Sequence, residues 1–265
     1  MTTFDFGHGP VPAHQHPNGG GWVADTATVA DSVFVGPNAW VSGNAKVSGD
    51  AKVYDNAIVS GDAQVYDNAH VYDNAKVYDN AKVYGDAWVY GDAEVCGDAR
   101  VGNAKVSGNA RVFGNAWVYD NAWVFGNARV YGDAHVYDNA RVSGNARVYG
   151  NAGVYDNARV FGSAQVYDNA KVYDDAWVFG NAIVYGNAHV YDSALVCCNA
   201  HVYGNAWVCG DAGVYENAQV YGDAVIWCNN WVYGDPGVFG KTQVYDNAGI
   251  HTKIEFLDKI KSFGE

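Results

Sequence analysis

An aliphatic residue recurs at every sixth position along almost the whole chain. Fourteen such positions run from Val23 to Val101, one five-residue step leads to Val106, and twenty-five run from Val106 to Ile250. Alanine stands two positions before nearly all of them, as in residues 55–59. Because residues two apart share one face of an extended strand, alanine and valine face a common core. The thirty-nine hexapeptides therefore predict one elongated repeat domain.

The other four positions of the hexapeptide divide into outward-facing residues and a corner. The residue between alanine and valine, here called the outward position, and the residue after valine, here called the aromatic position, both point away from the core. The last pair is Gly-Asn, Asp-Asn or Gly-Asp in most repeats. These residues tolerate positive φ and form tight corners. Each hexapeptide is predicted to be a four-residue strand followed by a two-residue corner.

A longer period of eighteen residues is visible in the second half of the chain. Aspartate recurs at this spacing in one row of corners, and aromatic residues recur in a row of their own: Asp120, Asp138, Asp156, Asp174 and Asp192; Phe113, Tyr131, Tyr149, Tyr167, Tyr185, Tyr203, Tyr221 and Phe239. Three corners with different residue habits predict a three-sided coil. The thirty-nine sides then make about thirteen coils, so the fold class is an all-β, single-stranded, three-sided β-helix.

The two ends of a solenoid need covers, because an open strand edge invites end-to-end growth. We expect residues 1–22 to be an irregular N-terminal cap, residues 23–250 to be the β-helix, and residues 251–265 to be a C-terminal cap. Apolar residues in the last segment have the spacing of a short amphipathic helix: Phe256, Leu257, Ile260 and Phe263.

The repeat unit resembles a known family. The spacing in residues 47–52, Val-Ser-Gly-Asp-Ala-Lys, is similar to that of hexapeptide-repeat left-handed β-helix proteins, particularly the YdcK-like group, whose repeats read G-D/N-A-x-V. The resemblance covers about residues 22–250 and implies left-handed coiling and, often, a homotrimer. The Gly- and Pro-rich segment 6–23 is similar to the leader of phage- and prophage-encoded repeat proteins.

Composition limits the cellular location and the classes of partner. No charged leader followed by an apolar run and no stretch of eighteen apolar residues is present, so we expect a cytoplasmic protein, in the host cytoplasm if phage-encoded. The five cysteines lack C-x-x-C spacing and are expected to be reduced thiols. The net charge of −13 disfavours binding to nucleic acid or to an anionic membrane.

Enzymatic activity is one hypothesis. Many proteins of the resembled fold are acyltransferases that use CoA or acyl-carrier donors and place a general-base histidine beside a protruding loop. This chain has no insertion from which such a loop could form. Four histidines, His70, His135, His189 and His201, occupy outward positions, where other polar residues also occur. We therefore expect no catalysis and keep acyl transfer as an alternative.

Metal binding is a second hypothesis. His14 and His16 could chelate, but no third and fourth ligand with recognisable spacing accompanies them. The aspartate row from Asp120 to Asp192 (120, 138, 156, 174, 192) could recruit Ca²⁺ through its oxygens. Aspartate is also a preferred corner residue. No cofactor is expected, and this row is the candidate calcium site.

The outward positions carry the strongest binding signal, because tryptophan recurs there beside cations. We predict a ligand site around a gap at Gly153, flanked by His135 and Lys171 and bordered by Tyr137, Tyr155 and Tyr173. The predicted ligand-binding set is Trp117, His135, Gly153, Tyr155, Lys171, His189 and Trp207. The predicted interface set is Trp123, Arg141, Arg159, Trp177 and Trp231.

The sequence therefore predicts a non-enzymatic binding scaffold. It would sequester a small anionic, aromatic or nucleotide-like ligand, or grip a partner protein, which would be a host protein if the leader marks a phage origin. The alternatives are an acyltransferase with an acyl-CoA donor and an acidic mimic of nucleic acid. We expect a homo-oligomer, with a trimer favoured, and neither a membrane nor nucleic acid as a direct partner.

Overall fold

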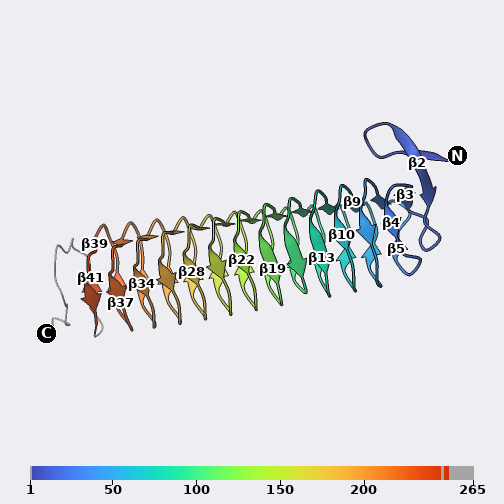
Figure 1. The fold of residues 1–265 in the computed structure, drawn as a ribbon. Helices are drawn as coiled ribbons and strands as arrows, with labels where there is room; N and C mark the ends of the chain where they lie inside the picture. Colours follow the sequence, from blue (N-terminus) through green and yellow to red (C-terminus); the bar gives the residue numbers. More distant parts are fainter. Residues whose placement is uncertain (1, 246–247, 251–265) are drawn as a thin grey trace. The chain divides into compact units, whose positions relative to one another are not determined.

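The computed structural model describes residues 2–245 and 248–250. The chain forms two compact units, Met1–Gly132 and Asp133–Glu265. The described residues of both units form β-strands and corners and contain no helix. Within each solenoid a strand pairs in parallel with the strand three places later in the chain, and this pairing produces three sheets. Figure 1 shows successive coils following one another within each unit. The expected three-sided β-solenoid of about thirteen coils is confirmed, and its left hand stays a prediction from the resemblance.

The first unit contains three sheets. Its first sheet is β1 (Thr3–Asp5), β2 (Pro10–Gln15), β3 (Trp22–Ala24), β6 (Trp40–Val41), β9 (Ile58–Val59), β12 (Lys76–Val77), β15 (Glu94–Val95), β18 (Arg111–Val112) and β21 (Arg129–Val130). The second is β4 (Thr28–Val29), β7 (Lys46–Val47), β10 (Gln64–Val65), β13 (Lys82–Tyr84), β16 (Arg100–Gly102) and β19 (Trp117–Tyr119). The third is β5 (Phe34–Val35), β8 (Lys52–Val53), β11 (His70–Val71), β14 (Trp88–Val89), β17 (Lys105–Val106) and β20 (Trp123–Val124).

The second unit repeats this plan. Its first sheet is β24 (Arg147–Val148), β27 (Gln165–Val166), β30 (Ile183–Val184), β33 (His201–Val202), β36 (Gln219–Val220) and β39 (Gly237–Val238). The second is β22 (His135–Val136), β25 (Gly153–Val154), β28 (Lys171–Val172), β31 (His189–Val190), β34 (Trp207–Val208), β37 (Val225–Ile226) and β40 (Gln243–Val244). The third is β23 (Arg141–Val142), β26 (Arg159–Val160), β29 (Trp177–Val178), β32 (Leu195–Val196), β35 (Gly213–Val214), β38 (Trp231–Val232) and β41 (Gly249–Ile250).

Most strands are two residues long, so the expected length of four residues is wrong. The regular strand holds only the outward residue and the valine, because the flanking alanine and aromatic positions adjoin the corners. Hydrogen bonding nevertheless continues past the strand ends. The Tyr191 amide donates to the Val208 carbonyl at 3.0 Å, and the corner amide of Asn187 donates to the Gly204 carbonyl at 2.7 Å. Corners and strands are thus part of one continuous ladder.

The core consists of the alanine and valine rows, as predicted. Val190 and Ala188, like nearly all their equivalents, have no exposed surface. Branched valine fits a pleated surface, whereas alanine allows the three walls to approach closely. The interior is therefore narrow, and function must be carried by outward-facing side chains.

The corners place their first residue in the left-handed region. Gly204 has φ +72°, and Asp192 has φ 55°. Aspartate gains a compensating contact there, since its carboxylate accepts the amide of the next corner, as Asp192 Oδ2 does from Gly210 N at 2.9 Å. The second corner residues form side-chain ladders in which each asparagine Nδ2 donates to Oδ1 of the next, from Asn151 through Asn169, Asn187 and Asn205 to Asp223. Aspartate ends this ladder because a carboxylate cannot donate.

The single five-residue step is absorbed at Gly102. The corner there shortens to Asn103 alone, at φ 55°, and the Tyr84 carbonyl accepts the Asn103 amide at 3.3 Å. Gly102 takes an aromatic position in the stack, and a Cβ on it would lie 2.5 Å from the Tyr84 ring. The Tyr84 ring thus occupies the space above the shortened coil.

The aromatic positions form rows of stacked rings. In the second unit, Tyr173 stacks on Tyr155 and Tyr191 with ring centroids 5.0 Å apart, nearly parallel. A second row continues from Tyr149 to Phe239 at 4.8–5.2 Å: Tyr149, Tyr167, Tyr185, Tyr203, Tyr221 and Phe239. Burial raises the pKa of Tyr173 to about 12, with help from Asp174 and Asp192.

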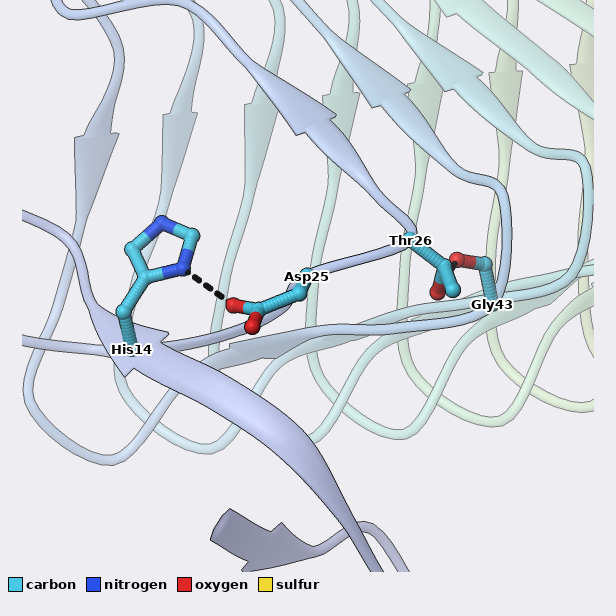
Figure 2. Close-up of polar contacts among 4 residues, drawn as sticks. All are labelled: His14, Asp25, Thr26 and Gly43. Carbon is cyan, nitrogen blue, oxygen red and sulfur yellow. Dashed lines mark hydrogen bonds and ion pairs between the residues drawn. The ribbon is translucent and has the colours of Figure 1, made fainter. Parts of the chain in front are cut away.

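Residues 1–22 were expected to be irregular, and this expectation is wrong. β1 and β2 form an antiparallel hairpin, and β2 pairs antiparallel with β3 at the edge of the first sheet. Phe4 stacks on Trp22 with centroids 4.6 Å apart, so ring packing holds the hairpin. Figure 2 shows His14 Nδ1 hydrogen-bonded to the Asp25 carboxylate, which accepts; the two atoms are 2.9 Å apart. The neighbouring Thr26 hydroxyl donates to the Gly43 carbonyl. The predicted helical cap over 251–265 lies outside the described residues.

The corner geometry yields a matched pair of substitutions at Gly204. Alanine there should lower the free energy of unfolding by about 1–2 kcal/mol, because a side chain is strained at positive φ. Gly204→Asp should lower it less, because its carboxylate can accept the Gly222 amide as Asp192 accepts that of Gly210. Urea unfolding followed by far-UV circular dichroism measures both. Equal losses would show that the carboxylate contact contributes nothing.

The raised tyrosine pKa values predict alkaline instability. Above pH 10 an unfolded tyrosine ionises, whereas Tyr173 in the folded chain keeps its proton until about pH 12. The folded state then binds more protons, so the free energy of unfolding falls as pH rises from about 10 to about 12. Tyr173→Phe should reduce this fall and leave stability at pH 8 nearly unchanged in melts across that range. An unaltered pH dependence in the variant would contradict the assignment.

Candidate binding faces

The second sheet of the second unit assembles most of the predicted ligand-binding set. His135, Gly153, Lys171, His189 and Trp207 follow one another in register on β22, β25, β28, β31 and β34. They therefore form one row on one face, as the eighteen-residue period predicts.

Trp117 belongs to the first unit, on β19. It is half-buried, and the Arg100 guanidinium lies 4.5 Å from its ring centroid.

The gap predicted at Gly153 is lined by apolar atoms. A Cβ on Gly153 would meet the Tyr155 ring at 3.4 Å and Lys171 Cγ at 3.9 Å. Tyr155 is itself held between Tyr137 at 4.8 Å and Tyr173 at 5.0 Å, measured between centroids. The Lys171 side chain thus contributes its aliphatic stem to the gap.

His189 contributes an aromatic surface to this face. Its ring stacks on Trp207 at 5.4 Å, and its Nδ1 lies 3.4 Å from the Tyr173 hydroxyl. Burial, followed by the charge of Lys171, lowers the pKa of His189 below its ordinary value. The imidazole is therefore mainly neutral at pH 7. Trp207 is 43% exposed, so this face presents a ring with one nearby cation, Lys171.

The third sheet of the second unit holds most of the predicted interface set. Arg141 and Arg159 are neighbours in register, and both are exposed. Neither forms an ion pair within the described part of the chain. The Arg159 guanidinium lies 4.8 Å from the Trp177 ring centroid, and Trp177 is 37% exposed. Guanidinium and indole are thus presented together.

The row continues beyond Trp177 through Leu195 and Gly213 to Trp231. Gly213 leaves no gap, because a Cβ on it would lie 2.2 Å from the Tyr215 ring. Tyr215 also lies 5.8 Å from Trp231, which is 54% exposed. We call this row the arginine–tryptophan stripe; it comprises Arg141, Arg159, Trp177, Leu195, Gly213 and Trp231.

Trp123, the remaining member of the predicted interface set, lies in the first unit on β20. Its indole Nε1 donates to Ser107 Oγ at 3.1 Å, and its ring lies 4.4 Å from Phe125. The side chain is half-buried and is held by neighbours within its own unit.

Two exposed tryptophans were missed by the sequence analysis. Trp88 is exposed on β14 and stacks on His70 with centroids 5.1 Å apart, a pairing that the eighteen-residue period could have found. Trp227 is exposed although it occupies an aromatic position, where most rings are half-buried. The repeat pattern gives no indication that the Trp227 ring is more exposed than other rings at this position.

The candidate metal ligands engage protein groups. Asp156 and Asp174 each accept the amide of the next corner, at 3.4 and 3.3 Å. Asp120 and Asp138 share the same positive φ. His14 contacts Asp25, whereas His16 is buried with Nδ1 3.3 Å from the Asn18 backbone, so the two imidazoles are not brought together. The residues that the structure describes contain no cluster of three or more His, Cys, Asp or Glu suited to a metal ion.

No helix in the described parts of the chain is long and apolar enough to cross a membrane.

Comparisons with known proteins identify the repeat. A family model of the YdcK beta solenoid repeat matches residues 51–65, 104–120, 122–138, 134–150, 140–155, 152–168 and 164–180. No curated protein sequence matches the chain. The crystal structure of a proposed acetyltransferase from Desulfovibrio desulfuricans G20 is similar over 82% of this chain and 66% of its own, slightly under two thirds, at 9% identity and a TM-score of 0.35. At that level it carries no argument about activity. The chain is a β-solenoid in which residues 51–65, 104–120 and 122–180 match the YdcK repeat.

Proposed function

We propose that the protein is a non-catalytic binding scaffold that docks an acidic partner protein on the arginine–tryptophan stripe. The observation that carries this proposal is the in-register row from Arg141 to Trp231 on one sheet. Five coil spacings of about 4.8 Å make the row about 24 Å long. A surface of this length suits a macromolecule better than a small ligand, which is usually enclosed in a concave site.

The residue types in the stripe support a protein contact. Tryptophan and arginine are enriched among residues that dominate interface energies. Trp177 and Trp231 leave much of their indole surface in water, and covering it would release hydrophobic free energy. The half-buried Leu195 between them extends the apolar surface. The stripe therefore combines an apolar centre with a cationic end.

The arginine pair favours an acidic partner. Arg141 and Arg159 face each other across one coil spacing, and like charges placed opposite each other are destabilising. A carboxylate from a partner would relieve this repulsion and could bind the guanidinium groups through two hydrogen bonds. Since the whole chain carries a charge of −13, attraction to an acidic partner must be local to the stripe.

The stripe is less suited to contact with a second copy of itself. It contains two arginines and no acidic residue, so a second copy of the stripe would bring no carboxylate to either guanidinium group. The homotrimer that the family resemblance implies would use other faces, and the partner would be a host protein if the leader marks a phage origin. The second face, where Lys171 is the cation beside the stacked rings of His189 and Trp207, supports a small anionic ligand less well.

Capture from a lysate of the source organism, or of its host, tests this proposal. Immobilised protein should retain a defined acidic protein whose binding weakens about tenfold with Arg159→Glu or Trp177→Ala, the loss expected for about 1.4 kcal/mol of contact energy. Arg147→Glu is the matched control, since Arg147 is an exposed arginine of the same unit on the first sheet. The Arg147→Glu variant should bind the captured protein as tightly as the wild type does.

Two outcomes would contradict the proposal. One is equal capture by wild-type protein and both stripe variants. The other is a change of oligomeric state in native mass spectrometry on Arg159→Glu, because the stripe would then join copies of this chain.

A further inference from the structure

Two adjacent cysteines form the closest pair of thiols in the described structure. Cys197 Sγ and Cys198 Sγ are 3.3 Å apart at the corner that follows β32. Cys197 is 5% exposed, whereas Cys198 is exposed at the corner with φ +66°. The pair therefore joins a sheltered sulfur to an accessible one.

Neither cysteine is the residue that its position ordinarily holds. Cys197 takes an aromatic position, where it follows the stack of Phe161 on Phe179, whose centroids are 4.9 Å apart. The next ring in that row, Tyr215, is folded over Gly213. Cys198 takes a left-handed corner that is glycine or aspartate in most coils, at a conformational cost for a side chain. The repeat does not require sulfur at either place.

The geometry points to chelation of a single atom by both sulfurs. Neighbouring Cα atoms across a trans peptide are about 3.8 Å apart, shorter than the roughly 4.4–6.8 Å usual for disulfides. The observed sulfur separation also exceeds the S–S bond of about 2.0 Å. A disulfide would require the two sulfurs to approach to bonding distance within a strained ring, whereas an atom that bridges the two sulfurs would not.

The separation can be compared with that expected for different bridging atoms. Two sulfurs held at about 2.3 Å, the length of a zinc–sulfur bond, lie about 3.8 Å apart at a tetrahedral angle. At the near-right angle of a pyramidal trivalent centre with similar bonds they lie about 3.3 Å apart. We propose that Cys197 and Cys198 form a binding site for trivalent arsenicals.

The reaction needs no oxidant. An organic arsenoxide, R–As=O, would react with the two thiols to form two As–S bonds. The two thiol protons leave with the oxygen as one water molecule, and arsenic remains trivalent. Cys198 gives access from solvent, and Cys197 completes the ring.

The surroundings of Cys197 favour its thiol form. Burial, and then the contact with Cys198, raise the pKa of Cys197 to about 12. A protonated thiol is a poor nucleophile toward peroxides and disulfides. Cys197 is thus a poor target for competing oxidation.

Titration with phenylarsine oxide, followed by intact-mass spectrometry, tests the site. Wild-type protein should bind one equivalent with the loss of one water, and a competing small dithiol should remove it. Cys198→Ser and Cys197→Ser should each weaken binding more than tenfold. Cys228→Ser is the matched control, because Cys228 is an exposed corner cysteine with φ +54° and should be dispensable.

Unchanged binding by Cys198→Ser would overturn the proposal, as would loss of binding in Cys228→Ser alone. Far-UV circular dichroism and the melting temperature establish that each serine variant is folded. As a second measurement, bound phenylarsine oxide should protect Cys198, and not Cys228, from alkylation by iodoacetamide. Equal alkylation of both would also count against the site.

Discussion

The structure depends on one constraint, the hydrogen-bond spacing between successive coils. Backbone amides of the outward and aromatic positions donate to the coil that follows them, at about 3 Å, as His189 does to Ala206 and Tyr191 to Val208. The ladder places a residue beside the one eighteen positions later, or seventeen later across the shortened coil, about 4.8 Å away. A residue is therefore selected for its fit with a copy of its own position. Long rows of valine, asparagine and tyrosine follow, because each of these can pack on or bond to itself.

The same constraint explains how much could be predicted from the sequence. A row that keeps one residue type recurs at a fixed spacing in the sequence. The three-sided coil, the valine core and the corner residues could therefore be predicted from the sequence. The order His135, Gly153, Lys171 and His189 followed from arithmetic and is confirmed. Strand length did not follow, because the limits of a strand depend on where the backbone bends. The hairpin of residues 3–15 has no hexapeptide period, and the ring contacts that hold it involve Trp22 and Trp40, which are far along the chain from Phe4.

The candidate site was less predictable because side-chain direction is not periodic. A glycine among large residues looks like a gap in sequence, yet Tyr215 folds over Gly213 and Tyr155 borders Gly153. Tyrosine has enough reach to take up space left by a neighbour, as Tyr84 does at the shortened coil. The charge of a histidine likewise depends on its surroundings. His189 is partly buried beside Lys171, so its pKa falls and its ring serves as a stacking surface.

These points locate where function can be encoded in such a fold. The core and corner rows are restricted by self-packing, so the outward positions are the ones free to vary from coil to coil. A departure from the repeat that costs stability therefore calls for a separate explanation. The pairing of Arg141 with Arg159 is one such departure, because two like charges repel each other. A lysine paired with a glutamate at these positions would attract each other instead. Cys198 in a left-handed corner is another, because glycine is available without strain. Both departures lie on or beside the third sheet of the second unit, where the strands themselves are as regular as elsewhere. Because the scaffold tolerates these costs without changing its ladder, it can carry a binding surface and a thiol pair as independent additions to one repeat.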